Sequence, residues 1–215
     1  MSSSESLFEH GRKVQAERDA PLAERMRPRT FDEFVGQDQI VDPDRVLLKS
    51  IAAGRLPSII LWGPPGTGKT TLARLVATST QSDFQPVSAV TSGVADLRRI
   101  VAEAKDRKGM HQQSTILFVD EIHRFNKAQQ DVILPHVEDG TVTFIGATTE
   151  NPSFEVIAPL LSRCRVFALQ SLEPDQMAAI VNRALTDSVR GLGPLNATLA
   201  EDALDHLVNI SNGDD

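Results

Sequence analysis

A small set of side chains in this chain has the types and spacing needed to handle a nucleoside triphosphate. Lys69 and Thr70 close the segment Gly63-Pro64-Pro65-Gly66-Thr67-Gly68-Lys69-Thr70, which is a G-x-x-x-x-G-K-T pattern. The segment follows the apolar run 59–62 and precedes a helix-like stretch, which is the strand–loop–helix setting of a P-loop. Glycines let the backbone close round phosphate oxygens, and the following helix adds its positive end.

The P-loop pattern gives each polar side chain a role. Lys69 is expected to reach the β- and γ-phosphates, and the Thr70 hydroxyl to bind Mg²⁺. A glycine-rich turn without a ligand is the alternative, and the strand and helix on either side make it the weaker one. The residues expected to bind the nucleotide are Gly63, Pro64, Pro65, Gly66, Thr67, Gly68, Lys69, Thr70 and Thr71.

Two acids end a second apolar run, Ile116 to Val119. Asp120 is placed to hold the same Mg²⁺ as Thr70. Glu121 is placed to polarise a water molecule for attack on the γ-phosphate, which is a general-base role. The alternative is that both acids only cap a helix, since acids favour helix N-termini. A P-loop in the same chain favours the catalytic interpretation.

Two further residues could complete such a site. Thr149 follows the run 144–147 and is expected near the γ-phosphate, where it could orient the attacking water; a plain strand end is the alternative. Arg163 could act as an arginine finger on a neighbouring subunit's nucleotide. Its alternative is a surface arginine paired with an acid. Cys164 has no histidine arrangement nearby and is expected to be a small buried apolar residue.

Alternating strands and helices must position these residues. Apolar, β-branched runs predict buried strands, and the stretches between them predict helices. The resulting α/β fold has a parallel sheet with helices on both faces and ligands at the carboxyl ends of the strands. Strands are expected at 59–62, 84–90, 116–119, 142–147 and 165–169, and helices at 37–53, 69–79, 93–108, 125–137 and 153–162.

Composition shifts along the chain predict its domains. Residues 1–19 are polar and expected to be disordered. Residues 20–171 are expected to form the large nucleotide-binding domain, in which the proline-bearing stretch 20–34 is extended. Residues 172–215 are expected to be a partial helical lid with helices at 175–187 and 198–210. Because so short a unit buries little surface, we expect the chain to be a fragment of a longer protein.

Composition narrows the class of protein. The chain has 215 residues, of which 40% are apolar, and its net charge is −7. The acidic balance argues against a protein that coats nucleic acid uniformly, although a local basic patch stays possible. No apolar run is long enough to span a bilayer, and the single cysteine fits a reducing cytoplasm. We expect a cytoplasmic protein that makes no membrane contact.

Taken together, the motifs resemble those of AAA+ ATPases. Within that superfamily the chain resembles the replication-associated recombination protein A family, related to the eukaryotic WRN-helicase-interacting ATPases. Residues 21–37 resemble the box before Walker A in clamp-loader-like members, and 63–70 is Walker A itself. The stretches 120–127, 146–154 and 161–165 match the family's Walker B, sensor-1 and arginine-finger motifs. The resemblance covers the chain from about residue 20 to its end.

The resemblance implies more than the motifs alone. It implies a parallel core of strand order 5-1-4-3-2 with a helical lid, and ATP and Mg²⁺ held between subunits of a ring with Arg163 supplied in trans. It places Val35 and Gly36 against the adenine, and it suggests that Ser88 restrains Glu121 until DNA binds. In the family, a sensor-2 arginine and an oligomerisation domain follow the region where this sequence stops.

The function implied by the resemblance is a DNA-dependent ATPase in replication, recombination and repair. Expected partners are DNA forks, gaps or duplex ends, further copies of the chain through the C-terminal domain, and replication proteins such as single-strand-binding protein. A bacterial member would lie in the cytoplasm with the nucleoid. Arg124 and Lys127 are possible DNA contacts, with a solvated helix face as the alternative.

Three other functions stay open. The chain could be a nucleotide-regulated module that recruits replication partners without significant hydrolysis. It could be a Holliday-junction branch-migration motor, a class that shares the Gly-Ala-Thr-Thr form of 146–149. A GTPase is weaker, because Asn126-Lys127 begins an N-K-x-D pattern whose acid is absent.

Overall fold

The computed structural model describes residues 19–211, which fall into two compact units. The sheet unit comprises Gln37–Ser171, and the helical unit combines the described residues up to Gly36 with those from Leu172 onward. Residues 20–36, assigned above to the large domain, therefore share a unit with the C-terminal helices. Apart from Asp19, the predicted disordered segment lies outside the described residues.

The sheet unit is built on a five-stranded parallel sheet of order β2-β3-β4-β1-β5. Read from the other edge this is 5-1-4-3-2, so the predicted topology is confirmed. In β1, Ile60 lies opposite Gly146 of β4 on one side and Val166 of β5 on the other. The strands are β1 (Ser58–Trp62), β2 (Asp83–Ser88), β3 (Thr115–Asp120), β4 (Thr143–Thr148) and β5 (Cys164–Ala168).

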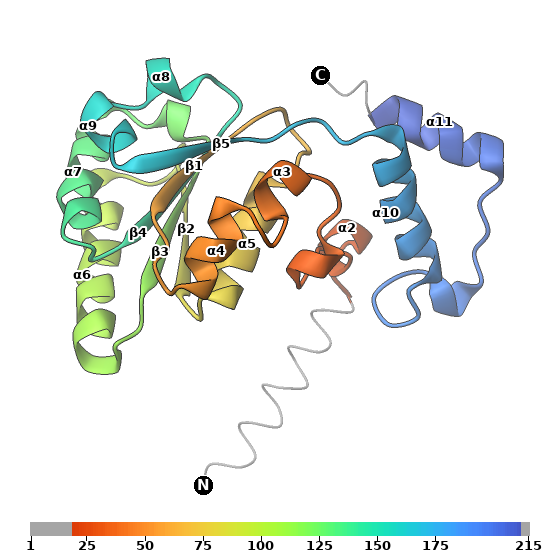
Figure 1. Ribbon diagram of the computed structural model, residues 1–215, viewed down its shortest axis with the longest axis horizontal. Helices are drawn as coiled ribbons and strands as arrows, with labels where there is room; N and C mark the ends of the chain where they lie inside the picture. Colours follow the sequence, from red (N-terminus) through yellow and green to blue (C-terminus); the bar gives the residue numbers. More distant parts are fainter. Residues whose placement is uncertain (1–18, 212–215) are drawn as a thin grey trace, which may run out of the picture. The chain divides into compact units, whose positions relative to one another are not determined.

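The central strands are apolar without alternation because both faces of the sheet are covered. Ile60 belongs to one large core cluster, while its neighbours Ile59 and Leu61 point to the opposite face, and all three are fully buried. Figure 1 shows α6 (Val94–His111) and α7 (Lys127–Glu138) on one side of the sheet and α4 (Val46–Ala52) and α5 (Lys69–Ser79) on the other. The sheet therefore holds its carboxyl ends rigidly for the loops that follow.

Local chemistry decides where the helices of this unit begin and end. The predicted single helix 37–53 was wrong: α3 (Asp38–Val41) and α4 are separated, because Pro43 forces Asp42 into an extended conformation. The predicted helix 153–162 was also wrong, since extended backbone at Val156 and Ile157 separates α8 (Pro152–Glu155) from α9 (Ala158–Leu161).

Helix α7 begins at Lys127 because Asn126 caps it. The Asn126 side chain accepts a hydrogen bond from the backbone N–H of Gln129, and the Gln129 side chain accepts one from the backbone N–H of Asn126, both at 2.9 Å. The cap ends the 3₁₀ turn η2 (Ile122–Arg124) that leaves β3, and so fixes the path of the chain just after the two acids.

The helical unit has more helical structure than the sequence predicted. The stretch 20–34, expected to be extended, instead contains α2 (Leu22–Arg25) and the 3₁₀ turn η1 (Phe31–Glu33). Pro21 stands at the N-cap of α2, and its carbonyl accepts the first helical hydrogen bonds, from Glu24 N–H at 2.9 Å and Arg25 N–H at 3.0 Å. The remaining elements, close to the two predicted helices, are α10 (Pro174–Thr186), η3 (Gly193–Leu195) and α11 (Glu201–Ser211).

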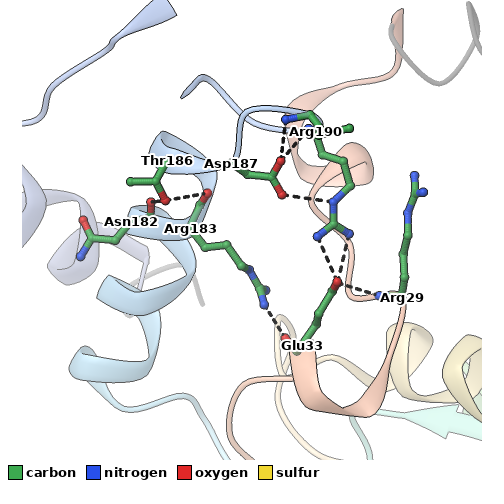
Figure 2. Close-up of polar contacts among 8 residues, drawn as sticks. Arg29, Glu33, Asn182, Arg183, Thr186, Asp187 and Arg190 are labelled. Atoms are coloured by element: carbon green, nitrogen blue, oxygen red, sulfur yellow. Dashed lines mark hydrogen bonds and ion pairs between the residues drawn. The ribbon is translucent and has the colours of Figure 1, made fainter. Parts of the chain in front are cut away.

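An ion-pair network joins η1 to the segment after α10 (Figure 2). The Arg190 guanidinium donates to both Glu33 carboxylate oxygens at 3.0 and 3.1 Å, and to Asp187 at 3.3 Å. Arg183 donates to the Glu33 backbone carbonyl at 2.7 Å. The hydrogen bond from Arg190 is the main reason that the pKa of Glu33 lies below its usual value. Residues 20–36 are thus tied to the C-terminal helices by charge as well as by packing.

Among the described residues, 19–211, none of the helices combines the length and the apolar character that a membrane span requires.

Candidate nucleotide site

The P-loop connects the carboxyl end of β1 to α5, as the sequence predicted for 63–70. Gly66 and Gly68 have φ of +74° and +90°, values that residues with a Cβ adopt only with strain. At Gly63, with φ of +156°, a Cβ would lie 2.4 Å from the Leu169 carbonyl oxygen. The loop therefore needs its glycines both for backbone conformation and for close approach, as expected of a P-loop.

The Lys69 side chain contacts the P-loop backbone and lies near the two acids at the end of β3. Its ammonium donates to the backbone carbonyls of Gly63 at 2.7 Å and Pro64 at 2.6 Å, and the residue is only 8% exposed. Burial lowers the pKa of Lys69, while the nearby negative charges of Glu121 and Asp120 act in the opposite direction. The fold thus brings the P-loop lysine within electrostatic reach of both acids at the end of β3.

Asp120 ends β3 and Glu121 follows it directly. Glu121 has φ of +55° and ψ of +53°, the left-handed conformation that a residue with a side chain adopts at a cost of about 1–2 kcal/mol. Such strain at the mouth of a sheet is typical of functional positions. The Thr70 hydroxyl and the Asp120 carboxylate carry oxygen donors, the type that Mg²⁺ prefers, so the chemistry of these two side chains fits the ion.

Sequence analysis assigned no role to His123, which contacts two residues of the site. Its Nδ1 lies 3.1 Å from Glu121 Oε2 and 3.0 Å from Thr148 Oγ1. Thr148 is fully buried at the end of β4, and its carbonyl accepts a hydrogen bond from Gly63 N–H at 3.2 Å. Thr149, the predicted water-orienting residue, follows directly and is half-buried. The sequence signal was the histidine soon after two acids, but nothing local showed that it reaches another strand.

Arg163 lies at the opposite end of the sheet. It precedes β5, whose first residue, Cys164, pairs with Ser58 at the start of β1. Its guanidinium contacts Glu138 at 2.5 Å and donates to the Pro159 carbonyl at 2.7 Å. A shallow cavity of about 590 Å³ adjoins this pair, lined by Leu56, Pro57, Ser58, Val137, Glu138, Gly140, Val142, Thr143 and Arg163.

A buried glutamine, also missed from the sequence, holds the segment that carries Arg163. Gln130 of α7 is 1% exposed and donates to the carbonyls of Phe125 at 3.2 Å and Glu155 at 3.0 Å. Its side-chain oxygen accepts the Ile157 N–H at 2.9 Å. These bonds fix the break between α8 and α9 and thereby the position of the loop before β5.

The other predicted residues lie in several places. Val35 and Gly36 belong to the helical unit, and their place beside the adenine stays a prediction. Ser88 pairs with Asp120 in register and its hydroxyl accepts the Val90 N–H, so its restraint of Glu121 also stays a prediction. Arg124 and Lys127 are exposed. Cys164, expected to be buried, is only partly buried beside the core cluster, and this burial raises the pKa of its thiol to about 12.

Comparison with known proteins shows which proteins this chain is similar to. The model of the Holliday junction DNA helicase RuvB P-loop domain matches residues 26–159. Replication-associated recombination protein A of Escherichia coli K12 is 48% identical over 194 residues, which are 90% of this chain and 43% of that protein. The ATPase WRNIP1 of Dictyostelium discoideum is 44% identical over 195 residues, 91% of this chain and 22% of that protein.

Solved structures agree with the sequence relatives. The Thermotoga maritima RuvB Holliday junction branch migration motor superposes with a TM-score of 0.70 at 28% identity, covering 88% of this chain and 61% of that one. The chain spans less than half the length of the two curated relatives given above. It belongs to the AAA+ P-loop ATPases of the RuvB P-loop domain type and, among them, to the replication-associated recombination protein A family.

Proposed function

We propose that the protein containing this chain hydrolyses ATP with Mg²⁺ and acts on DNA in replication-associated recombination and repair. The observation that carries the proposal is the place of buried Lys69: it bonds the P-loop carbonyls of Gly63 and Pro64 at the carboxyl end of β1, the end of the parallel sheet at which β3 leads into two acids. A buried ammonium beside two carboxylates and a glycine cradle suits the tail of a nucleoside triphosphate. The family membership supports the same reaction.

Each side chain has a defined task in this reaction. Phosphate oxygens would replace the carbonyls of Gly63 and Pro64 as acceptors for the Lys69 ammonium. Glu121 would accept a proton from the attacking water, and Thr149 would orient that water. Thr70 and Asp120 would hold Mg²⁺, which supplies charge neutralisation for the phosphate oxygens.

Arg163 would act on the nucleotide of a neighbouring subunit. It stands at the amino end of β1, whereas the P-loop leaves the carboxyl end, five residues or about 16 Å further along the strand. That separation is longer than an arginine side chain. Arg163 therefore suits an arginine finger in trans, which requires further copies of the chain in a ring.

The remaining assignments follow the family. DNA forks, gaps or duplex ends would stimulate hydrolysis, and single-strand-binding protein is a candidate partner. Val35 and Gly36 would contact the adenine. Arg124 and Lys127, exposed after β3, would contribute phosphate contacts, and reversal of both charges should then reduce the salt dependence of DNA binding. We place the protein in the cytoplasm with its DNA.

The test measures ATP binding by calorimetry and phosphate release with and without forked DNA. In the full-length protein, Glu121→Gln should bind ATP as the wild type does but release phosphate at least about 100-fold more slowly, because a general base contributes on that scale. Glu155→Gln, an exposed acid on α8, is the matched control and should stay active. No heat of ATP binding with Mg²⁺, or full turnover by Glu121→Gln, would contradict the proposal.

A branch-migration motor is the second candidate, because the RuvB motor is similar in structure. The two functions differ in what hydrolysis drives, so a four-way junction should be resolved into duplexes only by the motor. Phosphate release that forked DNA does not stimulate, together with ATP-dependent binding of replication proteins, would instead favour a recruitment module.

A further inference from the structure

His123 joins the ends of two strands at the mouth of the site. Its ring contacts the Glu121 carboxylate, which follows β3, and the Thr148 hydroxyl, which ends β4. The histidine side chain is only 17% exposed, whereas that of Glu121 is 38% exposed. The more exposed carboxylate thus contacts a more buried ring.

The two oxygens near His123 Nδ1 can both act as hydrogen-bond acceptors. The Glu121 carboxylate oxygen is an acceptor, so this contact is a hydrogen bond in the tautomer that carries its hydrogen on Nδ1. Thr148 Oγ1 already accepts the N–H of Glu150 at 3.0 Å, and its own hydrogen can go to the Glu150 carbonyl at 3.3 Å. An Nδ1–H group can therefore be shared between Glu121 and Thr148.

The surroundings keep the ring in place. His123 lies in the short turn η2, between Ile122, which is fully buried, and Phe125, which is 4% exposed. The left-handed backbone of Glu121 starts this turn, and Arg124 N–H bonds back to the Glu121 carbonyl at 2.9 Å. Packing on both sides of the turn thus restricts where the imidazole can point.

We propose that His123 is the positioning residue of the ATPase site: it ties the Glu121 carboxylate to Thr148 and so aims it at the attacking water. The inference rests on the proposed role of Glu121 as the general base. A base must lie within hydrogen-bond reach of the proton it takes, and small misplacement lowers the rate steeply. His123 does not touch the reacting atoms and acts only through Glu121.

The experiment compares His123→Leu with His123→Asn in the full-length protein. Leucine removes the donor, while the asparagine amide NH₂ can donate from nearly the position of Nδ1. His123→Leu should lower kcat about 10- to 100-fold, with ATP affinity and KM little changed. His123→Asn should recover kcat to within about threefold of wild type, because it restores a donor to the carboxylate.

Several results would overturn the inference. A folded His123→Leu with wild-type kcat shows that Glu121 needs no tether, and equal losses in both histidine variants show that a donor is not what matters. A loss of ATP affinity as large as the loss of kcat indicates a structural role instead. If His123→Leu does not fold, Thr148→Val removes the other anchor, and an unchanged kcat in that variant refutes the tether.

The Glu121→Gln variant distinguishes a failure of this inference from a failure of the proposed function. An active Glu121→Gln removes Glu121 from the base role and with it the reason for a tether. An inactive Glu121→Gln beside a fully active His123→Leu leaves the ATPase proposal standing and overturns the role of His123 alone.

Discussion

The ion pair between Arg163 and Glu138 sets up a measurable competition. If Arg163 serves a neighbouring nucleotide, it must first leave Glu138, 2.5 Å away. Both side chains are 42% exposed, so the pair is solvent-screened and contributes about 0.2–1 kcal/mol. Removing the Glu138 charge should therefore increase the population of released Arg163 by about 1.4- to 5-fold.

Glu138→Gln in the full-length protein should raise kcat by up to that factor, because more fingers are available at any moment. The assay is phosphate release with saturating ATP, Mg²⁺ and forked DNA, with KM measured in parallel. The unfolding temperature of Glu138→Gln should differ little from that of the wild type, since an exposed pair contributes at most about 1 kcal/mol. Ser162→Ala, which removes a second contact to Arg163 at 3.1 Å, is the matched perturbation and should change kcat in the same direction.

The Arg163→Ala variant measures how strongly kcat depends on this arginine. An arginine finger stabilises developing charge, and its loss should lower kcat on the order of 10³-fold. If Glu138→Gln folds normally but leaves kcat unchanged or lower, the ion pair does not compete with catalysis. If Arg163→Ala retains full turnover, Arg163 has no finger role, and the Glu138 ion pair has no catalytic arginine to compete for.

Three further outcomes are expected. Glu33→Gln should lower the unfolding free energy by about 1–2 kcal/mol at pH 7. Because folding lowers the pKa of Glu33, the stability difference between wild type and Glu33→Gln should be fully present above pH 4.5, the usual pKa of a glutamate. It should shrink as the pH falls below 4.5. A stability difference that calorimetry finds independent of pH would exclude the Arg190 pair as its cause. Gly63→Ala should destabilise the fold more than Gly54→Ala does, and it should weaken ATP binding. Both glycines have positive φ, but of the two only Gly63 would bring a Cβ against a backbone oxygen, at 2.4 Å. Equal unfolding midpoints for the two variants would contradict this. Cys164 should resist iodoacetamide at pH 8 in the folded protein and react only after denaturation, because burial raises its pKa to about 12.

Much of the fold and site could be predicted from local sequence. The P-loop could be predicted because its backbone requires glycine at fixed positions, as the positive φ of Gly66 and Gly68 shows. The apolar run before Asp120 and Glu121 marks a strand buried on both faces, and its end marks the sheet edge where ligands bind. The strand order came from family resemblance and agrees with the structure.

Errors arose where a side chain or a proline overrode periodicity. Pro43 ended α3, and the buried Gln130 side chain bonded the Ile157 backbone, so two predicted helices were each broken. Hydrophobic spacing carries no information about either effect, because one depends on backbone sterics and the other on a contact between distant segments.

The sequence alone determined which chemical groups are present and which end of the sheet most of them occupy, because strand, loop and helix patterns are local. Only the tertiary structure decided that His123 reaches Thr148, 25 residues away, and that Arg163 pairs with Glu138 at the far end of the sheet. Such pairings depend on which strand ends are neighbours and on how packing restricts each side chain. Those properties exist only once the sheet has assembled.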